Sequence, residues 1–247
     1  MRCAIGSFFP SPMPALVITP VKDALGATLT TIEAIQSGEL PLEYRVYNDY
    51  SSPETEKGLE KAAKQHKFQL IHLRDLTDAP SPNYKTVLQH AQKYALAQNL
   101  SLIIVESDVT VKKDTLSKLI AFSEQHPSTG LVGAVTVDEQ NKVNFPYLKF
   151  KDEKASLINT KRSLSFCCTL LSNRFLHSYD FSHLDTSKDW FDTHISKKSL
   201  ENGFENVVLM DTRVLHRPHG SRPWKQLKYT NPVKYYLNKF FKGRDKI

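Results

Sequence analysis

The sequence predicts an α/β protein with a doubly wound, mostly parallel sheet that is flanked by helices. Short apolar runs, typical of buried strands, alternate with segments of helical periodicity through the first two thirds of the chain. Polar residues also recur directly after several of these runs, as expected where a parallel sheet binds ligands along one edge. Alternation at this spacing favours right-handed β-α-β units.

The elements follow from local signals. The first strand is the apolar run 15–19, and the helix after it carries Leu29, Ile32 and Ile35 at helical spacing before Gly38. A later helix is expected to begin at Pro53. The remaining expected elements are strands at 44–47, 69–73, 102–105 and 131–137, and helices over 84–97 and around 116–122. Ser52 is the expected N-cap of the helix that begins at Pro53.

The chain has 247 residues and a net charge of +7, but this charge is unevenly distributed. Residues 222–247 contain eight basic residues and one acidic residue, so the rest of the chain is neutral. A neutral body offers no broad groove for phosphates, and no nucleic-acid partner is expected. The sequence contains no apolar run of about 18 residues, the length that a membrane span requires. Cys167 and Cys168 are adjacent, fit no disulfide framework or zinc spacing, and are expected to pack as small apolar side chains.

Four polar residues follow predicted strands: Thr19, Asp49, Glu106 and Asp108. The carboxyl ends of parallel strands share one edge of a sheet, so these side chains are expected to converge there. Glu106-x-Asp108 can present carboxylate oxygens to Mg²⁺ or Mn²⁺, a chemistry that suits a diphosphate leaving group. A solvated acidic loop is the alternative for this pair, and capping of the following helix is the alternative for Asp49.

Three segments together resemble the family-2 inverting glycosyltransferases of GT-A fold: residues 15–20, 46–55 and 105–109. The family usually has two acids, a glycine and a serine after its second strand, where this chain has Asn48-Asp49-Tyr50-Ser51. Glu106 stands where the family's Asp-x-Asp motif begins, and Asp108 matches its last acid. The resemblance implies that Thr19, Pro20, Asp49 and Glu106 bind the nucleotide. It also implies that Asp108 binds Mg²⁺ or Mn²⁺.

The resemblance continues downstream. Residues 130–135 followed by Asp138-Glu139, and residues 166–171, are similar to later family segments. Residues 191–198 followed by Gly203-Phe204 resemble the family's acidic helix, which implies that Asp192 is the catalytic base. Asp189 is the alternative base, and a solvated helix face is the structural alternative for both acids. Residues 214–216 with Gly220-Ser221 resemble the closing segment, where His216 would complete the metal or phosphate site unless it belongs to a solvated basic loop.

These features imply a metal-dependent inverting glycosyltransferase that moves a sugar from a nucleotide-diphosphate donor to a hydroxyl of a glycan or lipid-linked acceptor, in polysaccharide or glycolipid biosynthesis. Two alternatives stay open: a catalytically inactive scaffold of the same fold, and a nucleotidyltransferase-like sugar-nucleotide enzyme. The second would require a glycine-rich loop after the first strand, and residues 19–23 contain none. The expected domain is 1–221, with a nucleotide-binding half at about 14–110 and an acceptor half at about 111–221.

The basic, aromatic tail at 222–247 contains a predicted amphipathic helix. Asn231 is its expected N-cap and Pro232 its first residue, and it should end near Gly243. Its apolar face consists of Val233, Tyr236, Leu237, Phe240 and Phe241. This face could lie on an anionic membrane surface, at the inner face of the membrane, or it could dock on the protein's own domain. The protein is expected to be cytoplasmic, because its three cysteines form no disulfide framework.

Overall fold

The computed structural model describes residues 15–40, 42–185, 190–217 and 231–241 of the chain. The strands are β1 (Ala15–Val21), β2 (Glu43–Asn48), β3 (Gln69–His72), β4 (Ser101–Val105), β5 (Val109–Thr110), β6 (Thr129–Val137), β7 (Leu157–Asn159), β8 (Cys168–Leu171) and β9 (Glu205–His216). The helices are α1 (Leu25–Gln36), α2 (Pro53–Gln65), α3 (Tyr84–Ala97), α4 (Thr115–Gln125), α5 (Asn173–Ser178), α6 (Phe191–Glu201) and α8 (Pro232–Phe241), with 3₁₀ turns at Leu73–Asp75, Leu148–Phe150 and Phe181–His183.

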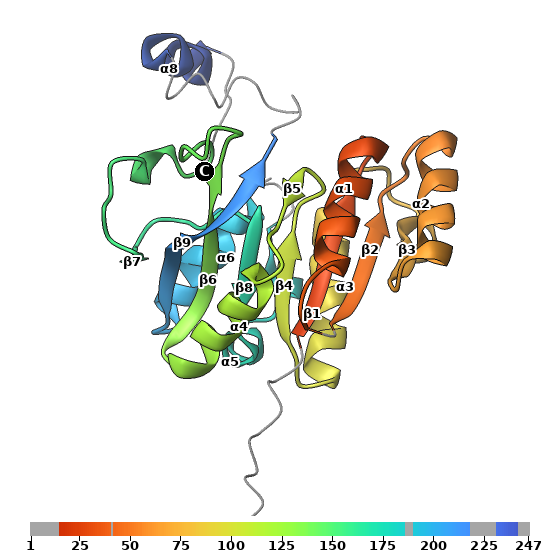
Figure 1. Cartoon of the computed structure of the whole chain (residues 1–247), viewed down its shortest axis with the longest axis horizontal. Helices are drawn as coiled ribbons and strands as arrows, with labels where there is room; N and C mark the ends of the chain where they lie inside the picture. The colour runs from red at the N-terminus through yellow and green to blue at the C-terminus, as the bar shows by residue number, and fades with distance from the viewer. Residues whose placement is uncertain (1–14, 41, 186–189, 218–230, 242–247) are drawn as a thin grey trace, which may run out of the picture.

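All the described strands belong to one sheet, in the order β3-β2-β1-β4-β8-β6-β9-β5, with β7 also paired to β9 (Figure 1). β3, β2, β1 and β4 are mutually parallel, and so are β6 and β9. The predicted α/β fold with a mostly parallel sheet is therefore confirmed. The main addition is β8, a short strand that runs antiparallel between β4 and β6 and joins the two parallel parts.

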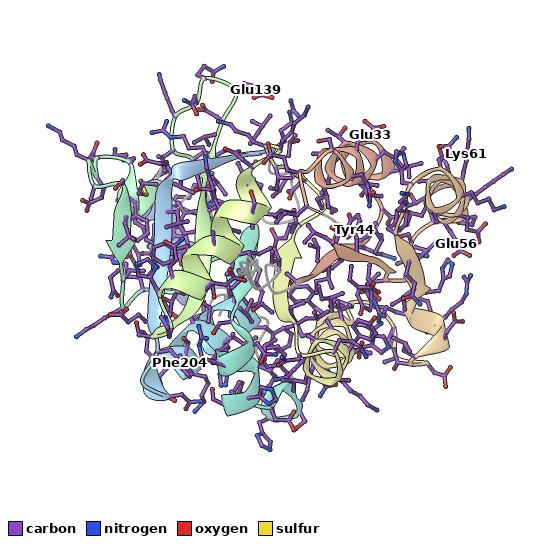
Figure 2. All side chains as sticks on the ribbon, turned by 60° about the horizontal axis from the view of Figure 1, so that its bottom comes forward. Glu33, Tyr44, Glu56, Lys61, Glu139 and Phe204 are labelled. Atoms are coloured by element: carbon purple, nitrogen blue, oxygen red, sulfur yellow. The ribbon has the colours of Figure 1, made fainter. Side chains whose placement is uncertain are left out.

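Helices cover both faces of the sheet, and each face has its own apolar core. In β1, Leu16 and Ile18 face the core beneath α3, α5 and α6, whereas Ala15 and Val17 face the core beneath α1, α2 and α4. The alternation follows from the two-residue repeat of a strand, and a run buried on both faces must be apolar throughout. Figure 2 shows this layering, with Tyr44 at the sheet and Glu33 and Lys61 on the helices outside it.

Local capping signals explain where two helices begin. The Ser52 side chain accepts a hydrogen bond from the backbone N–H of Thr55, and Pro53 is the first residue of α2. Ser52 is thus the cap, and the alternative that Asp49 caps this helix is wrong. In α8, the Asn231 side chain accepts from the backbone N–H of Lys234 at 3.1 Å, so the expected N-cap is present.

The first strand is longer than its apolar run suggested. Thr19, Pro20 and Val21 continue the parallel ladder opposite residues 46–48 of β2, so β1 ends only at Val21. Thr19 consequently lies inside the strand and not after it, because parallel pairing with β2 extends the strand past the end of the apolar pattern. Within the described ranges, no helix is both long enough and apolar enough to cross a membrane.

Candidate active site

The pairing of β5 with β9 brings together two residues that are far apart in sequence. β5 follows Glu106-x-Asp108 directly, and its Val109 lies opposite His216 at the end of β9 (Figure 1). The Arg217 N–H donates to the Asp108 carbonyl at 3.1 Å, which extends this contact by one residue. As a result, the Asp108 Oδ2 atom lies 3.4 Å from His216 Nε2, with both side chains buried.

The His216 ring is oriented by the backbone. Its Nδ1 atom lies 2.7 Å from the Phe145 carbonyl oxygen, which can only accept, so Nδ1 carries a hydrogen. When the ring is charged, Nε2 also carries a hydrogen and can donate it to Asp108. When the ring is neutral, Nε2 has a lone pair that can bind a metal ion. Burial lowers the pKa of His216, but the Asp108 hydrogen bond and the charges of Asp108 and Glu106 outweigh it and raise this pKa. A histidine held through its other nitrogen in this way is typical of metal ligands.

Glu106 and Cys167 complete a compact group of donors around His216. The Glu106 N–H donates to the Cys167 carbonyl at 3.0 Å, so the end of β4 and the start of β8 are held together. The Cys167 thiol lies 3.3 Å from Glu106 Oε2 and 3.8 Å from His216 Nε2. The Glu106, Cys167 and His216 donor atoms all lie within 4.8 Å of one another, a spacing that could hold a metal ion.

Cys167 was not predicted as a site residue. It was expected to pack as a small apolar side chain, but its polar neighbours make it part of this donor group. The sequence holds only a weak signal, which is that Cys167 immediately precedes an apolar strand in the way that Glu106 immediately follows one. Only the pairing of β4 with β8 shows that the two residues meet.

Asp192 approaches this group from the first turn of α6. Burial and the charge of Asp108 raise the pKa of Glu106, and the charge of Asp192 adds to that rise. Asp192 also raises the pKa of Tyr84, together with burial and Glu106. The structure therefore brings Asp192 within electrostatic reach of the acidic motif. The alternative base, Asp189, lies outside the described residues.

The position of α6 depends on close packing against β6. An added Cβ at Gly130 of β6 would lie 2.2 Å from Ser199 Oγ and 2.8 Å from Phe204 Cβ, so only glycine allows this approach. The helix ends at Glu201, and Gly203 two residues later has a φ of +83°, which glycine adopts at little cost. Ser196 Oγ accepts a hydrogen bond from the Leu164 N–H at 3.0 Å. These contacts fix the middle and the C-terminal end of α6, the helix whose first turn carries Asp192.

Tyr84, the first residue of α3, was also missed from the sequence. Its hydroxyl is buried and has no hydrogen-bond partner among the described residues, while its ring packs against Phe191 with a centroid distance of 6.3 Å. The pKa of this hydroxyl is raised well above its ordinary value, first by burial and then by the charges of Glu106 and Asp192. A buried, unpartnered hydroxyl beside two carboxylates is an available donor for a ligand.

Asp49 is connected to the same region through the segment that precedes α3. Its carboxylate accepts from Ser81 Oγ at 2.8 Å, from the Asn83 N–H at 2.9 Å and from Asn83 Nδ2 at 2.9 Å. Because Asn83 precedes Tyr84, Asp49 fixes the start of α3. Thr19 is placed differently: its side chain is fully buried, and its hydroxyl pairs with that of Tyr44 at 2.9 Å. Thr19 therefore exposes no atom to a ligand, whereas Pro20 beside it is partly exposed.

The family of this chain is decided by a profile match. The profile described as glycosyl transferase family 2 matches residues 16–179, which is more than half of the chain. The chain belongs to glycosyl transferase family 2. No curated protein matches it.

Solved structures agree with a family-2 fold of GT-A type. The mannosyltransferase PcManGT from Pyrobaculum calidifontis, in complex with GDP-Man and Mn²⁺, is 17% identical with a TM-score of 0.66, covering 96% of this chain and 66% of its own. TarS 1–349 from S. aureus, in complex with UDP-GlcNAc, is 17% identical with a TM-score of 0.66, covering 90% and 66%. GalNAc-T7 with UDP, GalNAc and Mn²⁺ is 14% identical with a TM-score of 0.63, covering 94% and 48%. The chain thus spans less than two thirds of these proteins' lengths.

The structure explains two departures of this family-2 chain from the expected pattern. Tyr50, where a glycine is usual, has a φ of +53°, which is strained for a side chain but ordinary for glycine. Its hydroxyl donates to the Thr77 carbonyl at 2.5 Å, a contact that glycine cannot make. Asn48, where an acid is usual, is buried and bonds Ser51 and His72, so it supports the fold of the loop.

The donors at the site suit a divalent cation. Carboxylate oxygens and an oriented imidazole, held by neighbouring strands, are ligands of Mg²⁺, Mn²⁺ and other divalent metals. The Asp108–His216 distance of 3.4 Å is compatible with two ligands of one ion. Asp108 and His216, the two residues that the sequence assigned to a metal, are therefore adjacent. The pairing of β5 with β9 brings them together.

Proposed function

We propose that this protein is a metal-dependent, inverting glycosyltransferase that moves a sugar from a nucleotide-diphosphate donor to a hydroxyl acceptor. The observation that carries the proposal is the convergence of Glu106 and Asp108, His216 and Asp192 from three parts of a family-2 fold. PcManGT and TarS, two proteins of similar fold, were solved with GDP-Man and UDP-GlcNAc, which supports a nucleotide-sugar donor.

In this proposal Asp192 is the catalytic base. Inverting transfer needs an acceptor hydroxyl that attacks the sugar from the side opposite the diphosphate, and a base to accept its proton. A base within hydrogen-bond reach contributes on the order of 10²–10⁴-fold to the rate. The charge of Asp192 acts on Glu106 and Tyr84, so its carboxylate is within electrostatic reach of the acidic motif, where a donor sugar would be held.

Asp108 and His216 would hold Mg²⁺ or Mn²⁺, which supplies positive charge against the departing diphosphate when bound. The presence of Mn²⁺ with PcManGT and with GalNAc-T7 supports a divalent metal. We assign the nucleotide to the half at about 14–110, at the site formed by Thr19, Pro20, Asp49 and Glu106. The acceptor would bind the half at about 111–221, which carries Asp192.

A thermal-shift panel tests the donor and the metal together. UDP-glucose, UDP-N-acetylglucosamine and GDP-mannose are each added with Mn²⁺, with Mg²⁺ and with EDTA. We expect at least one donor to raise the melting temperature only when a metal is present. If no nucleotide sugar shifts the melting temperature under any of these conditions, the proposal fails.

Substitution of the base tests the chemistry. Asp192→Asn should abolish transfer to the acceptor while the dissociation constant for the donor changes little, because the amide keeps the shape but cannot take the proton. Asp189→Asn is the matched control. Full turnover in Asp192→Asn with loss in Asp189→Asn would move the base to Asp189. Donor binding by the wild type without any transfer product would instead favour an inactive scaffold, and release of a new nucleotide sugar would favour a nucleotidyltransferase.

We also propose that the tail, residues 222–247, binds an anionic membrane surface on the cytoplasmic face. There the enzyme would be near a glycan or lipid-linked acceptor of polysaccharide or glycolipid biosynthesis. The supporting observation is that Val233, Tyr236 and Leu237 of α8 are 70%, 57% and 52% exposed, so the described part of this apolar face is open to solvent. Figure 1 shows α8 apart from the sheet and its helices. In a flotation assay with phosphatidylserine vesicles, the full chain should float with the vesicles and a chain lacking residues 222–247 should not. Equal flotation of the two chains would refute membrane binding by the tail.

A further inference from the structure

The thiol of Cys167 lies among the carboxylates and the histidine of the proposed metal site, and the proposed function gives it no role. Cys167 precedes β8, and its carbonyl accepts the Glu106 N–H at 3.0 Å, so the backbones of the two residues are held by the sheet. Its thiol is buried and lies 3.3 Å from Glu106 Oε2, to which it donates. The backbone and the side chain of Cys167 therefore both contact Glu106, the first residue of the acidic motif.

Three separations between donor atoms are close to those of neighbouring ligands around one ion. Bonds of about 2.0–2.3 Å to Zn²⁺ at angles between about 90° and 110° separate neighbouring ligand atoms by about 2.9–3.6 Å. The structure has 3.3 Å between Cys167 Sγ and Glu106 Oε2, 3.4 Å between Asp108 Oδ2 and His216 Nε2, and 3.8 Å between Cys167 Sγ and His216 Nε2. Only the last exceeds the range, and by a few tenths of an ångström.

We propose that Cys167 is a metal ligand, so that this site combines oxygen, nitrogen and sulfur donors. The inference rests on the proposed metal site and extends it to a choice of metal. Thiolates bind Zn²⁺ and other transition metals well, whereas Mg²⁺ prefers oxygen donors and an octahedral shell rich in water. Coordination replaces the S–H bond with a sulfur–metal bond and releases the thiol proton to solvent. A thiolate ligand would therefore favour Zn²⁺ or Co²⁺ over Mg²⁺ at this site.

The neighbouring cysteine provides a matched control. Cys168 is fully buried in β8 and has no part in the donor group. Cys168→Ser therefore changes the same atom one residue away without removing a ligand. Cys3 lies outside the described residues, and Cys3→Ser removes its thiol as a second source of sulfur.

The test is the absorption spectrum of the full chain titrated with Co²⁺. The double variant with Cys3→Ser and Cys168→Ser leaves Cys167 as the sole thiol, and we expect it to give an intense sulfur-to-cobalt charge-transfer band in the near ultraviolet. Adding Cys167→Ser should abolish this band while the weak visible bands show that Co²⁺ still binds. The same change should lower Zn²⁺ affinity by at least the roughly 10–100-fold that loss of an outer-shell partner costs, and leave Mg²⁺ affinity nearly unchanged.

The outcomes separate this inference from the proposed function. Visible cobalt bands without a charge-transfer band in the double variant would overturn the role of Cys167 and leave the oxygen and nitrogen site intact. A band that survives Cys167→Ser would overturn it as well. If no Co²⁺ binds at all, both the metal dependence of the proposed function and the role of Cys167 as a ligand are refuted. Because the double variant retains Cys167, the test is decisive even if Cys167→Ser does not fold.

Discussion

The hydroxyl of Tyr84 should reduce the stability of the free protein, and its removal should stabilise the fold. The hydroxyl is buried without a hydrogen-bond partner among the described residues, and its neighbours Glu106 and Asp192 are acidic. A buried polar group left unpaired costs about 1–3 kcal/mol. Tyr84→Phe removes that group but keeps the ring, including its packing on Phe191 at 6.3 Å.

We expect Tyr84→Phe to raise the free energy of unfolding by about 1–2 kcal/mol. For a domain of this size, each kcal/mol corresponds to a rise in melting temperature of about 2–4 °C. The assay is urea and thermal unfolding of the ligand-free protein in EDTA. Tyr44→Phe is the matched control, because it also removes one oxygen from a buried tyrosine but breaks the 2.9 Å bond to Thr19. It should lower the free energy of unfolding by about 1–3 kcal/mol.

The two variants should thus move stability in opposite directions. If Tyr84→Phe destabilises the protein as Tyr44→Phe does, the Tyr84 hydroxyl has a partner in solution and the reasoning fails. If the unpaired hydroxyl of Tyr84 forms a hydrogen bond to the bound nucleotide sugar, Tyr84→Phe should also weaken the binding of that donor. The expected loss of affinity is about 5–10-fold, the equivalent of one hydrogen bond. Unchanged affinity in calorimetry would show that the hydroxyl does not contact the donor.

Three further predictions concern the groups around this site. Asp49→Asn replaces an acceptor of three hydrogen bonds with a side chain that points N–H groups at donors, and should cost about 1–3 kcal/mol in urea unfolding and weaken nucleotide binding; unchanged stability would contradict the observed bonds. Because folding raises the pKa of His216, its contribution to stability in EDTA should be complete below about pH 6.5 and be lost as the pH rises through the folded value. The stability difference between wild type and His216→Gln should therefore shrink with rising pH, and a constant difference would exclude the pairing with Asp108. Gly130→Ala places a Cβ 2.8 Å from Phe204 Cβ and should displace α6, costing about 1–3 kcal/mol and most of the transfer rate, whereas unaltered kinetics would show that α6 need not be fixed there.

Much of the fold could be predicted because its signals are local. The apolar run that begins at Ala15 can only be buried on both faces, and Ser52 before Pro53 starts a helix by its own hydrogen bond. The end of β1 could not be predicted in this way. It lies at Val21 because pairing with β2 continues past the apolar pattern, and pairing is a property of two segments.

The candidate site divides along the same line. Glu106 and Asp108 could be proposed from the sequence because they directly follow a predicted buried strand, at the edge where a parallel sheet binds ligands. Cys167 and Tyr84 could not, because neither has a neighbour in sequence that reveals its chemistry. Cys167 acquires its role when β8 pairs with β4, and Tyr84 when the start of α3 is bound to Asp49 through Asn83.

The sequence by itself determined the α/β class, the main strands and helices, the acidic motif and the neutral body with its basic tail. These depend on composition and on periodicities of a few residues. The tertiary structure alone decided that His216 meets Asp108, that a thiol joins their group and that Asp192 lies close enough to act on Glu106. Such contacts join residues 49–108 positions apart, and they form only when β8 and β9 pair within the sheet and α6 packs against it, so no local pattern can encode them.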